Sequence, residues 1–188
     1  MTTVSGVPAS WVKHDVTLTF SAADRGSGVA RSIYLPYGTS IWSDVPDNDQ
    51  VTLSTEGDNA IQFYSWDAAV PVANIEAVKT AHVLIDKTAP TAVALASASV
   101  KRGALAMLRF KLADNVSPTC DVKLLIKTAK GKLVKTVPVL GEPTTPTPMA
   151  TFSKFPCGLA KGKYKWSCRA TDEAGNSFTS AAKTLTVK

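Results

Sequence analysis

The sequence has no long hydrophobic run. No apolar stretch approaches the roughly 18 to 20 residues that a membrane-spanning helix needs, so we expect no insertion into a membrane. The opening stretch MTTVSGVPASW has neither a basic start nor an apolar centre, which is not the pattern of a signal peptide. The strand-like ending KTLTVK indicates a fragment of a longer protein.

Residues that commonly carry catalysis are scarce. The only two histidines, His14 and His82, lie far apart in the sequence, and the motifs GxSxG, HExxH, CxxC and the phosphate-binding loop are absent. The carboxylates fall in predicted turns instead of converging on one cleft. We therefore expect no catalytic site and no enzymatic activity.

Acidic residues are scarce in the second half of the chain only. Residues 1–89 carry 5 Lys and Arg against 10 Asp and Glu, a net charge of −5, whereas residues 90–188 carry 16 against 5, a net charge of +11. The two values add up to the +6 of the whole chain. The sign changes at the stretch IDKTAPT (85–91), which indicates a boundary between two domains, 1–88 and 89–188.

Alternating hydrophobicity dominates both halves and predicts half-buried β-strands. We find no convincing helical period, and the segment VANIEAVKTAHVLI (72–85) fits a last strand better than a short helix. The residues expected to face inward are Val16, Leu18 and Phe20; Leu108, Phe110 and Leu112; Val122, Leu124 and Ile126; and Tyr164, Trp166, Cys168 and Ala170.

The two halves also correspond to each other. VTLTFSAAD (16–24) matches AMLRFKLAD (106–114), IQFYSWDAA (61–69) matches KWSCRATDEAGN (165–176), and AHVLID (81–86) matches AKTLTV (182–187). A repeat of roughly 90 to 100 residues with about seven short strands is typical of an immunoglobulin-like sandwich. The predicted fold is therefore all-β, with two tandem immunoglobulin-like β-sandwich domains.

The stretch IDKTAPT then has a structural interpretation as the linker. Ile85 is expected to end the last strand of the first domain, and Thr91 to begin the first strand of the second. Pro90 favours an extended conformation and cannot donate to a strand ladder. We expect a short, stiff linker.

The first half resembles the bacterial extracellular immunoglobulin-like repeat. The matching stretches are VSGVPASWVKHDVTLTFSAADRGSGVARSIY, EGDNAIQFYSWDAA and VLIDKTAPT, which together cover residues 4–91. The usual glycine of the sixth-strand turn is missing from DAAVPVAN, where Asp67 and Asn74 are retained. The second half is similar to the broader class through GKYKWSCRATDEAGN. This resemblance implies an extracellular or cell-surface location within a multidomain bacterial protein, and a spacing, adhesion or accessory role.

Strand direction brings a group of acidic side chains to one pole of the second domain. The second and sixth strands of a sandwich end at the pole where the first strand enters, so Asp114, Asp172 and Asn176 should meet the linker residue Asp86. Such oxygen ligands suit Ca²⁺. The alternative is that Asp114 and Asp172 only cap turns through backbone hydrogen bonds.

The three cysteines lie in the second half. Cys120 begins the predicted third strand and Cys168 lies late in the sixth, which is its antiparallel neighbour. We therefore expect a Cys120–Cys168 disulfide, with Cys157 unbridged at the opposite end. The alternative is that all three are small buried hydrophobic residues.

Two exposed features suggest ligands. Tyr37 and Trp42, in the loop-rich stretch LPYGTSIWSDVP, could stack on sugar rings, or Trp42 could pack in the core beside Trp11 while Tyr37 shapes a turn. A basic face on the third and sixth strands could attract wall teichoic acid or acidic polysaccharide, or could simply be solvated. Nucleic acid is less favoured, because no aromatic residues are interleaved with these cations. The face consists of Lys123, Lys127, Lys163, Lys165 and Arg169.

These features favour a non-catalytic role. We expect a spacer or adhesion module whose partners are neighbouring domains of a longer chain, together with a polysaccharide or anionic cell-wall polymer. The alternative is a carbohydrate-binding accessory module of a secreted glycan-active enzyme. No cofactor other than Ca²⁺ is expected.

Overall fold

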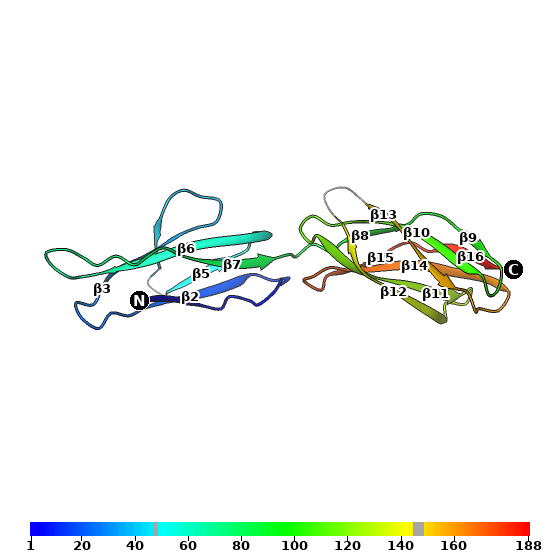
Figure 1. The fold of residues 1–188 in the computed structure, drawn as a ribbon, viewed down its shortest axis with the longest axis horizontal. Coiled ribbons are helices and arrows are strands. Elements are labelled where there is room, and N and C mark those ends of the chain that lie inside the picture. The colour runs from blue at the N-terminus through cyan, green and yellow to red at the C-terminus, as the bar shows by residue number, and fades with distance from the viewer. Residues whose placement is uncertain (47–48, 145–148) are drawn as a thin grey trace. The chain divides into compact units, whose positions relative to one another are not determined.

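The chain consists of two immunoglobulin-like β-sandwiches. The computed structural model describes residues 1–46, 49–144 and 149–188, and all of their regular secondary structure is strand. The chain divides into two compact units, Met1–Lys87 and Thr88–Lys188, one residue before the boundary expected from the charge pattern (Figure 1). The described residues contain no helix that is long and apolar enough to cross a membrane.

The first unit has two antiparallel sheets. One has the strand order β1-β2-β5 and the other the order β4-β3-β6-β7. The strands are β1 (Thr2–Ser5), β2 (Val16–Ala22), β3 (Val29–Leu35), β4 (Ser43–Asp44), β5 (Gln50–Leu53), β6 (Gly57–Asp67) and β7 (Lys79–Ile85).

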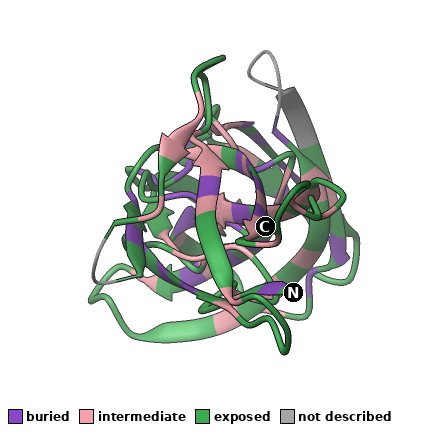
Figure 2. Cartoon of the chain, turned by 90° about the vertical axis from the view of Figure 1, so that its left-hand side faces the viewer, coloured by how far each residue is buried: buried purple, intermediate pink, exposed green. Residues whose placement is uncertain are grey.

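The inner faces of these sheets form the first core. Along β2, Val16, Leu18 and Phe20 are buried while the threonines between them are exposed, as the alternation predicts. From the opposite sheet, Ile61 and Phe63 join this core, and the Phe63 ring meets Phe20 edge-on at a centroid distance of 5.5 Å. The same alternation runs along β10 (Leu105–Ala113) of the second unit, and Figure 2 colours the chain by the burial of each residue.

The second unit has the same two-sheet plan with longer strands. Its sheets have the orders β13-β10-β8 and β12-β11-β14-β16-β9, and β15 pairs with β14. All pairings are antiparallel except that between β16 and β9. The strands are β8 (Thr91–Ala94), β9 (Ala98–Val100), β10 (Leu105–Ala113), β11 (Thr119–Thr128), β12 (Leu133–Pro143), β13 (Met149–Pro156), β14 (Gly162–Thr171), β15 (Ser177–Thr179) and β16 (Lys183–Val187).

The second core contains the side chains that the sequence pattern predicts to face inward. Trp166 is completely buried, and a fully buried apolar side chain of this kind contributes roughly 1.5 to 3 kcal/mol or more relative to exposure. Tyr164 is partly buried against the same cluster. The other predicted residues found in this core are Leu108, Phe110, Leu112, Val122, Leu124, Ile126, Cys168 and Ala170.

The linker begins and ends where the sequence predicts. Strand β7 ends at Ile85 and β8 begins at Thr91. The backbone N–H of Asp86 donates to the carbonyl of Val12 (2.9 Å), which satisfies the first linker amide. Pro90 is buried, in agreement with a proline that ends the linker at the start of a strand.

The turn DAAVPVAN (67–74), which follows β6, is closed by side-chain hydrogen bonds. Oδ1 of Asp67 accepts from the backbone N–H groups of Ala69 (3.1 Å) and Asn74 (2.8 Å), and Oδ2 accepts from Nδ2 of Asn74 (2.6 Å). These bonds favour the charged carboxylate and hold the pKa of Asp67 below its ordinary value. Asp67 and Asn74 therefore fix the turn without a glycine between them.

The predicted disulfide is wrong. Cys120, Cys157 and Cys168 are all buried thiols. The register of β11 and β14 places Cys168 opposite Leu124, so Cys120 lies four residues further along its strand, a shift of about 13 Å. A disulfide needs Cα atoms about 4.4 to 6.8 Å apart. The inward orientation of both cysteines was predicted correctly, but their position along the strands was not.

Candidate functional site

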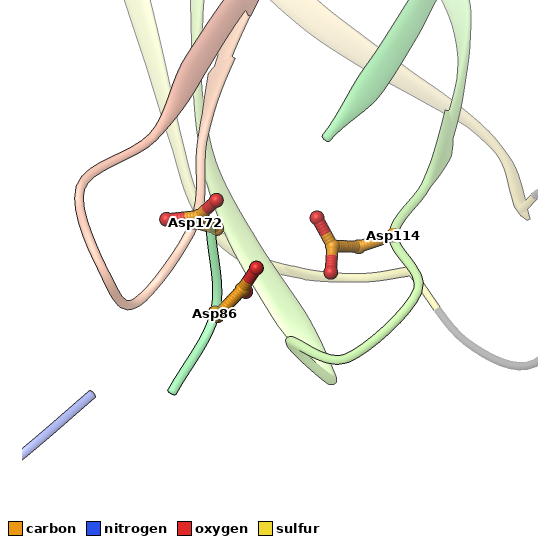
Figure 3. Close-up of side chains that lie close together, drawn as sticks. All are labelled: Asp86, Asp114 and Asp172. Atoms are coloured by element: carbon orange, nitrogen blue, oxygen red, sulfur yellow. The ribbon is translucent and has the colours of Figure 1, made fainter. Parts of the chain in front are cut away.

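Three carboxylates gather at the linker end of the second unit. Asp86 is in the linker, Asp114 directly follows β10, and Asp172 directly follows β14. One carboxylate oxygen from each residue lies within 4.8 Å of the other two, and the side chains face a common space (Figure 3). Asp86 is fully buried and Asp172 is 7% exposed. We refer to these three residues as the carboxylate cluster.

The two carboxylate oxygens of Asp114 have different roles: one stabilises a turn, and the other belongs to the carboxylate cluster. Oδ1 accepts hydrogen bonds from the backbone N–H groups of Val116 (2.9 Å) and Ser117 (2.7 Å), which shapes the loop after β10. Oδ2 is buried and has no hydrogen-bond partner. A buried carboxylate oxygen without a donor is unfavourable, so Oδ2 of Asp114 is suited to receive a ligand.

Asp172 shows the same division. Oδ1 accepts from the backbone N–H of Asn176 (2.7 Å), and Oδ2 is buried without a partner. The side-chain amide of Asn176 donates to the carbonyl of Thr88 (3.4 Å), which ties the linker to the turn between β14 and β15. The turn-capping interpretation is therefore correct for one oxygen of each aspartate, and the other oxygen remains available. A role for Asn176 as a metal ligand stays a prediction.

The spacing of the cluster fits one calcium ion. Oxygens that bind the same ion lie at most two metal–oxygen bond lengths apart, which is about 4.6 to 5.2 Å for Ca²⁺ and about 4.2 Å for Mg²⁺. The three carboxylate oxygens lie within 4.8 Å of one another, so a single ion could contact all of them. Without a cation, two carboxylates at this separation repel by roughly 3 kcal/mol at an effective dielectric constant of about 20. A divalent cation would remove this repulsion, with the remaining ligands supplied by backbone carbonyls and water.

The predicted basic face lies on the outer side of β11 and β14. In the strand register, Lys123 is directly opposite Arg169, and Lys127 is directly opposite Lys165. Lys163 lies two residues before Lys165 and on the same face of β14. All five side chains are exposed. The structure therefore brings together every cation that the sequence analysis assigned to this face.

The two predicted aromatic residues are placed differently from each other. The ring of Trp42 packs against Tyr64 at a centroid distance of 5.0 Å and an interplanar angle of 80°, and is not part of the core cluster. Tyr37 is 48% exposed. Trp42 therefore does not fill the core beside Trp11 as one interpretation held.

The partners of Trp42 were missed by the sequence analysis. Tyr64 lies opposite Ile33 in the register of β6 and β3, on the outer face of the sheet, and Trp66 follows it at 6.0 Å between ring centroids. The guanidinium of Arg31 lies 5.6 Å from the Trp66 ring centroid. The alternation in IQFYSWD places Tyr64 and Trp66 on the same face, so this signal was present in the sequence. The path of the loop that carries Trp42 cannot be predicted from the sequence.

The histidines form no group with the carboxylate cluster. Nδ1 of His82 lies 2.9 Å from both carboxylate oxygens of Asp58, and both side chains are at least half exposed. His14 contacts the backbone carbonyl of Asp15 (2.8 Å).

Comparison with known proteins finds a likeness among solved structures alone. No family model matches the chain, and no curated protein matches it. Among solved structures, the chain is similar to one described as a marsupial T cell receptor, with 12% sequence identity and a TM-score of 0.47. That match covers 100% of this chain and 72% of the other.

Proposed function

We propose that this chain is a structural spacer or adhesion module of an extracellular or cell-surface protein, and that Ca²⁺ bound by the carboxylate cluster restricts its linker. The observation that carries the proposal is the pair of buried, unpartnered Oδ2 atoms on Asp114 and Asp172 beside the linker carboxylate of Asp86. Three carboxylates in one small space favour the binding of a cation. Their number favours calcium, because Mg²⁺ is usually held by only one or two carboxylates.

The surroundings of the linker support the same role. Lys87, the residue after Asp86, donates its backbone N–H to Oε1 of Glu56 (2.7 Å) and its Nζ to the carbonyl of Ser54 (2.7 Å). The next residue, Thr88, is held by Asn176. A linker whose successive residues are bound in this way, and whose aspartate binds an ion, would be short and stiff, as a spacer requires.

A calcium-dependent melting experiment tests this proposal. Extracellular calcium modules have dissociation constants of about 10⁻⁴ to 10⁻³ M, so about 10 mM Ca²⁺ should stabilise the folded chain by roughly 2 kcal/mol. The melting temperature in Ca²⁺ should exceed that in excess chelator by several degrees. Asp86→Ala should abolish this shift, while Asp58→Asn, which removes a carboxylate outside the cluster, should preserve it. Equal melting temperatures of the unmodified chain in Ca²⁺ and in chelator would refute the proposal.

A measurement of linker motion tests the spacer role itself. Spin labels placed on exposed strand positions of the two units should give a narrower distance distribution in Ca²⁺ than in chelator. A distribution that Ca²⁺ leaves unchanged would argue against a calcium-stiffened linker, whatever the melting experiment shows.

A further inference from the structure

The basic face contains an arrangement that is unfavourable for the isolated chain. Two pairs of cations, Lys123 with Arg169 and Lys127 with Lys165, occupy directly opposite positions on neighbouring antiparallel strands. Directly opposite residues have Cβ atoms about 4.5 to 5.5 Å apart, and like charges there are destabilising. Nothing in the fold requires cations at these exposed positions, because an uncharged polar residue would fill them equally well.

Among the described residues, no acidic side chain forms an ion pair with these five cations. Within the described residues, none of the five cations has a carboxylate oxygen within the 4.0 Å of an ion pair, and the ion pairs that are present involve other residues. Arg169 donates only to the hydroxyl of Ser177 (3.1 Å). The second unit as a whole carries 16 Lys and Arg against 5 Asp and Glu, a net charge of +11. Asp121 is exposed two residues before Lys123 on the same face of β11, but five cations against one carboxylate leave an excess of positive charge, which an anionic partner would neutralise.

The face is also hollowed at one of the two cation pairs. A depression of about 270 Å³ lies between the two strands and the loops beside them. Lys127 and Lys165 both line it, together with Leu125, Ser167 and Thr179, and most of the lining surface is apolar. An anionic group seated there would lie between two ammonium groups.

We infer that the basic face binds a linear polyanion whose charges are phosphodiesters, with one phosphate seated between Lys127 and Lys165. The cations follow the strands, since Lys163 and Lys165 are two residues apart and Arg169 lies four residues beyond Lys165. These intervals correspond to about 7 and 13 Å along a strand. A polymer lying along β14 would therefore meet charges at intervals of about 7 to 13 Å.

The residue types suit phosphodiesters and disfavour single-stranded nucleic acids. Four of the five cations are lysines, which bind phosphate as point charges, and the planar fork of Arg169 fits phosphate oxygens as well as carboxylate oxygens. On the neighbouring β16, Thr184 lies opposite Lys165 and Thr186 lies opposite Lys163. Both threonines add hydroxyl groups to the face. Aromatic side chains for base stacking are absent from the outward positions of β11, β14 and β16, and single-stranded nucleic acids generally need them.

Binding of poly(glycerol phosphate), measured by titration calorimetry in chelator and about 50 mM salt, tests this inference. The variant Lys123→Gln, Lys127→Gln, Lys165→Gln should lose about tenfold or more in affinity. The control variant Lys101→Gln, Lys111→Gln, Lys154→Gln removes the same number of charges outside the face and should lose much less. The chelator keeps the result independent of the calcium proposal.

Two comparisons decide the class of polymer. Polygalacturonate and oligothymidylate of similar charge should bind more weakly than poly(glycerol phosphate). An equal or tighter affinity for either polymer, an equal loss in both triple variants, or no binding of poly(glycerol phosphate) would each overturn the inference. Thermal melting provides an independent readout, because relief of the like-charge pair should make Lys165→Gln at least as stable as the unmodified chain.

Discussion

Asp114 and Asp172 hold their carboxylates in the same way at the ends of two different strands. In each residue Oδ1 accepts backbone N–H groups of the following turn, and Oδ2 is buried without a partner. One side chain thus shapes a turn and presents an oxygen to the carboxylate cluster. Because the two oxygens have different roles, the structural and the ligand-binding roles can be separated by mutation.

Two substitutions at Asp172 should separate these roles. Asp172→Asn keeps an acceptor for the N–H of Asn176 but removes one negative charge, so in chelator it should raise the free energy of unfolding by roughly 3 kcal/mol. Asp172→Ala removes the same charge but also the acceptor, so its free energy of unfolding should be about 1 to 2 kcal/mol lower than that of Asp172→Asn. Urea unfolding measures both values. If Asp172→Asn lowers the free energy of unfolding in chelator as much as Asp172→Ala does, repulsion among the three carboxylates is not significant.

The cysteines should behave as three unreactive thiols. Burial disfavours the thiolate and raises the pKa of Cys168 to about 11, although a hydrogen bond with Ser180 acts in the opposite direction. At pH 8 only about one Cys168 in a thousand would be ionised. A thiol reagent should therefore label no cysteine in the folded chain and all three in denaturant. An intact mass lower by two hydrogens under non-reducing conditions would show that a disulfide does form.

The acid stability of the first unit should depend on Glu76. Burial opposes the charged form of Glu76, but hydrogen bonds from Thr2 and the ammonium group of Lys79 outweigh this effect and lower its pKa from 4.5 to about 2. Because the folded pKa is the lower one, the stabilisation is present above about pH 4.5 and is lost as the pH falls toward 2. The stability of the unmodified chain should therefore fall more steeply over this range than that of Glu76→Gln. Parallel pH profiles would contradict the assignment.

Trp42 should act in packing and not in glycan binding. Trp42→Ala removes the edge-on contact with Tyr64 and should lower the free energy of unfolding by about 1 to 2 kcal/mol. Tyr37→Ala changes an exposed side chain and should stay within about 0.5 kcal/mol. Specific glycan binding that Trp42→Ala abolishes without loss of stability would instead support the carbohydrate-binding alternative.

The features predicted most accurately from the sequence are those set by strand parity and strand direction. A period of two requires Val16, Leu18 and Phe20 to share one face, whatever their neighbours are. Direction alone places the end of β10 and the end of β14 at one pole, and so predicts that Asp114 and Asp172 meet. The proline and threonines of IDKTAPT likewise mark the end of β7 and the start of β8.

The features that were missed depend on register and on loop paths. Parity alone cannot say whether Cys168 faces Cys120 or Leu124, because sliding one strand by two or four residues preserves every inward face. The additional pairing of β15 with β14, the hollow between Lys127 and Lys165, and the contact of Trp42 with Tyr64 arise from loop conformations. No periodic pattern encodes those conformations.

The central claim is that the carboxylate cluster binds one calcium ion, and calorimetric titration of the chelator-treated chain with Ca²⁺ tests it most directly. We expect one ion per chain with a dissociation constant of about 10⁻⁴ to 10⁻³ M, and a loss of affinity of at least about tenfold in Asp114→Asn and Asp172→Asn. Asp58→Asn should bind as the unmodified chain does. No saturable binding up to about 10 mM Ca²⁺, or equal binding by Asp172→Asn, would contradict the claim.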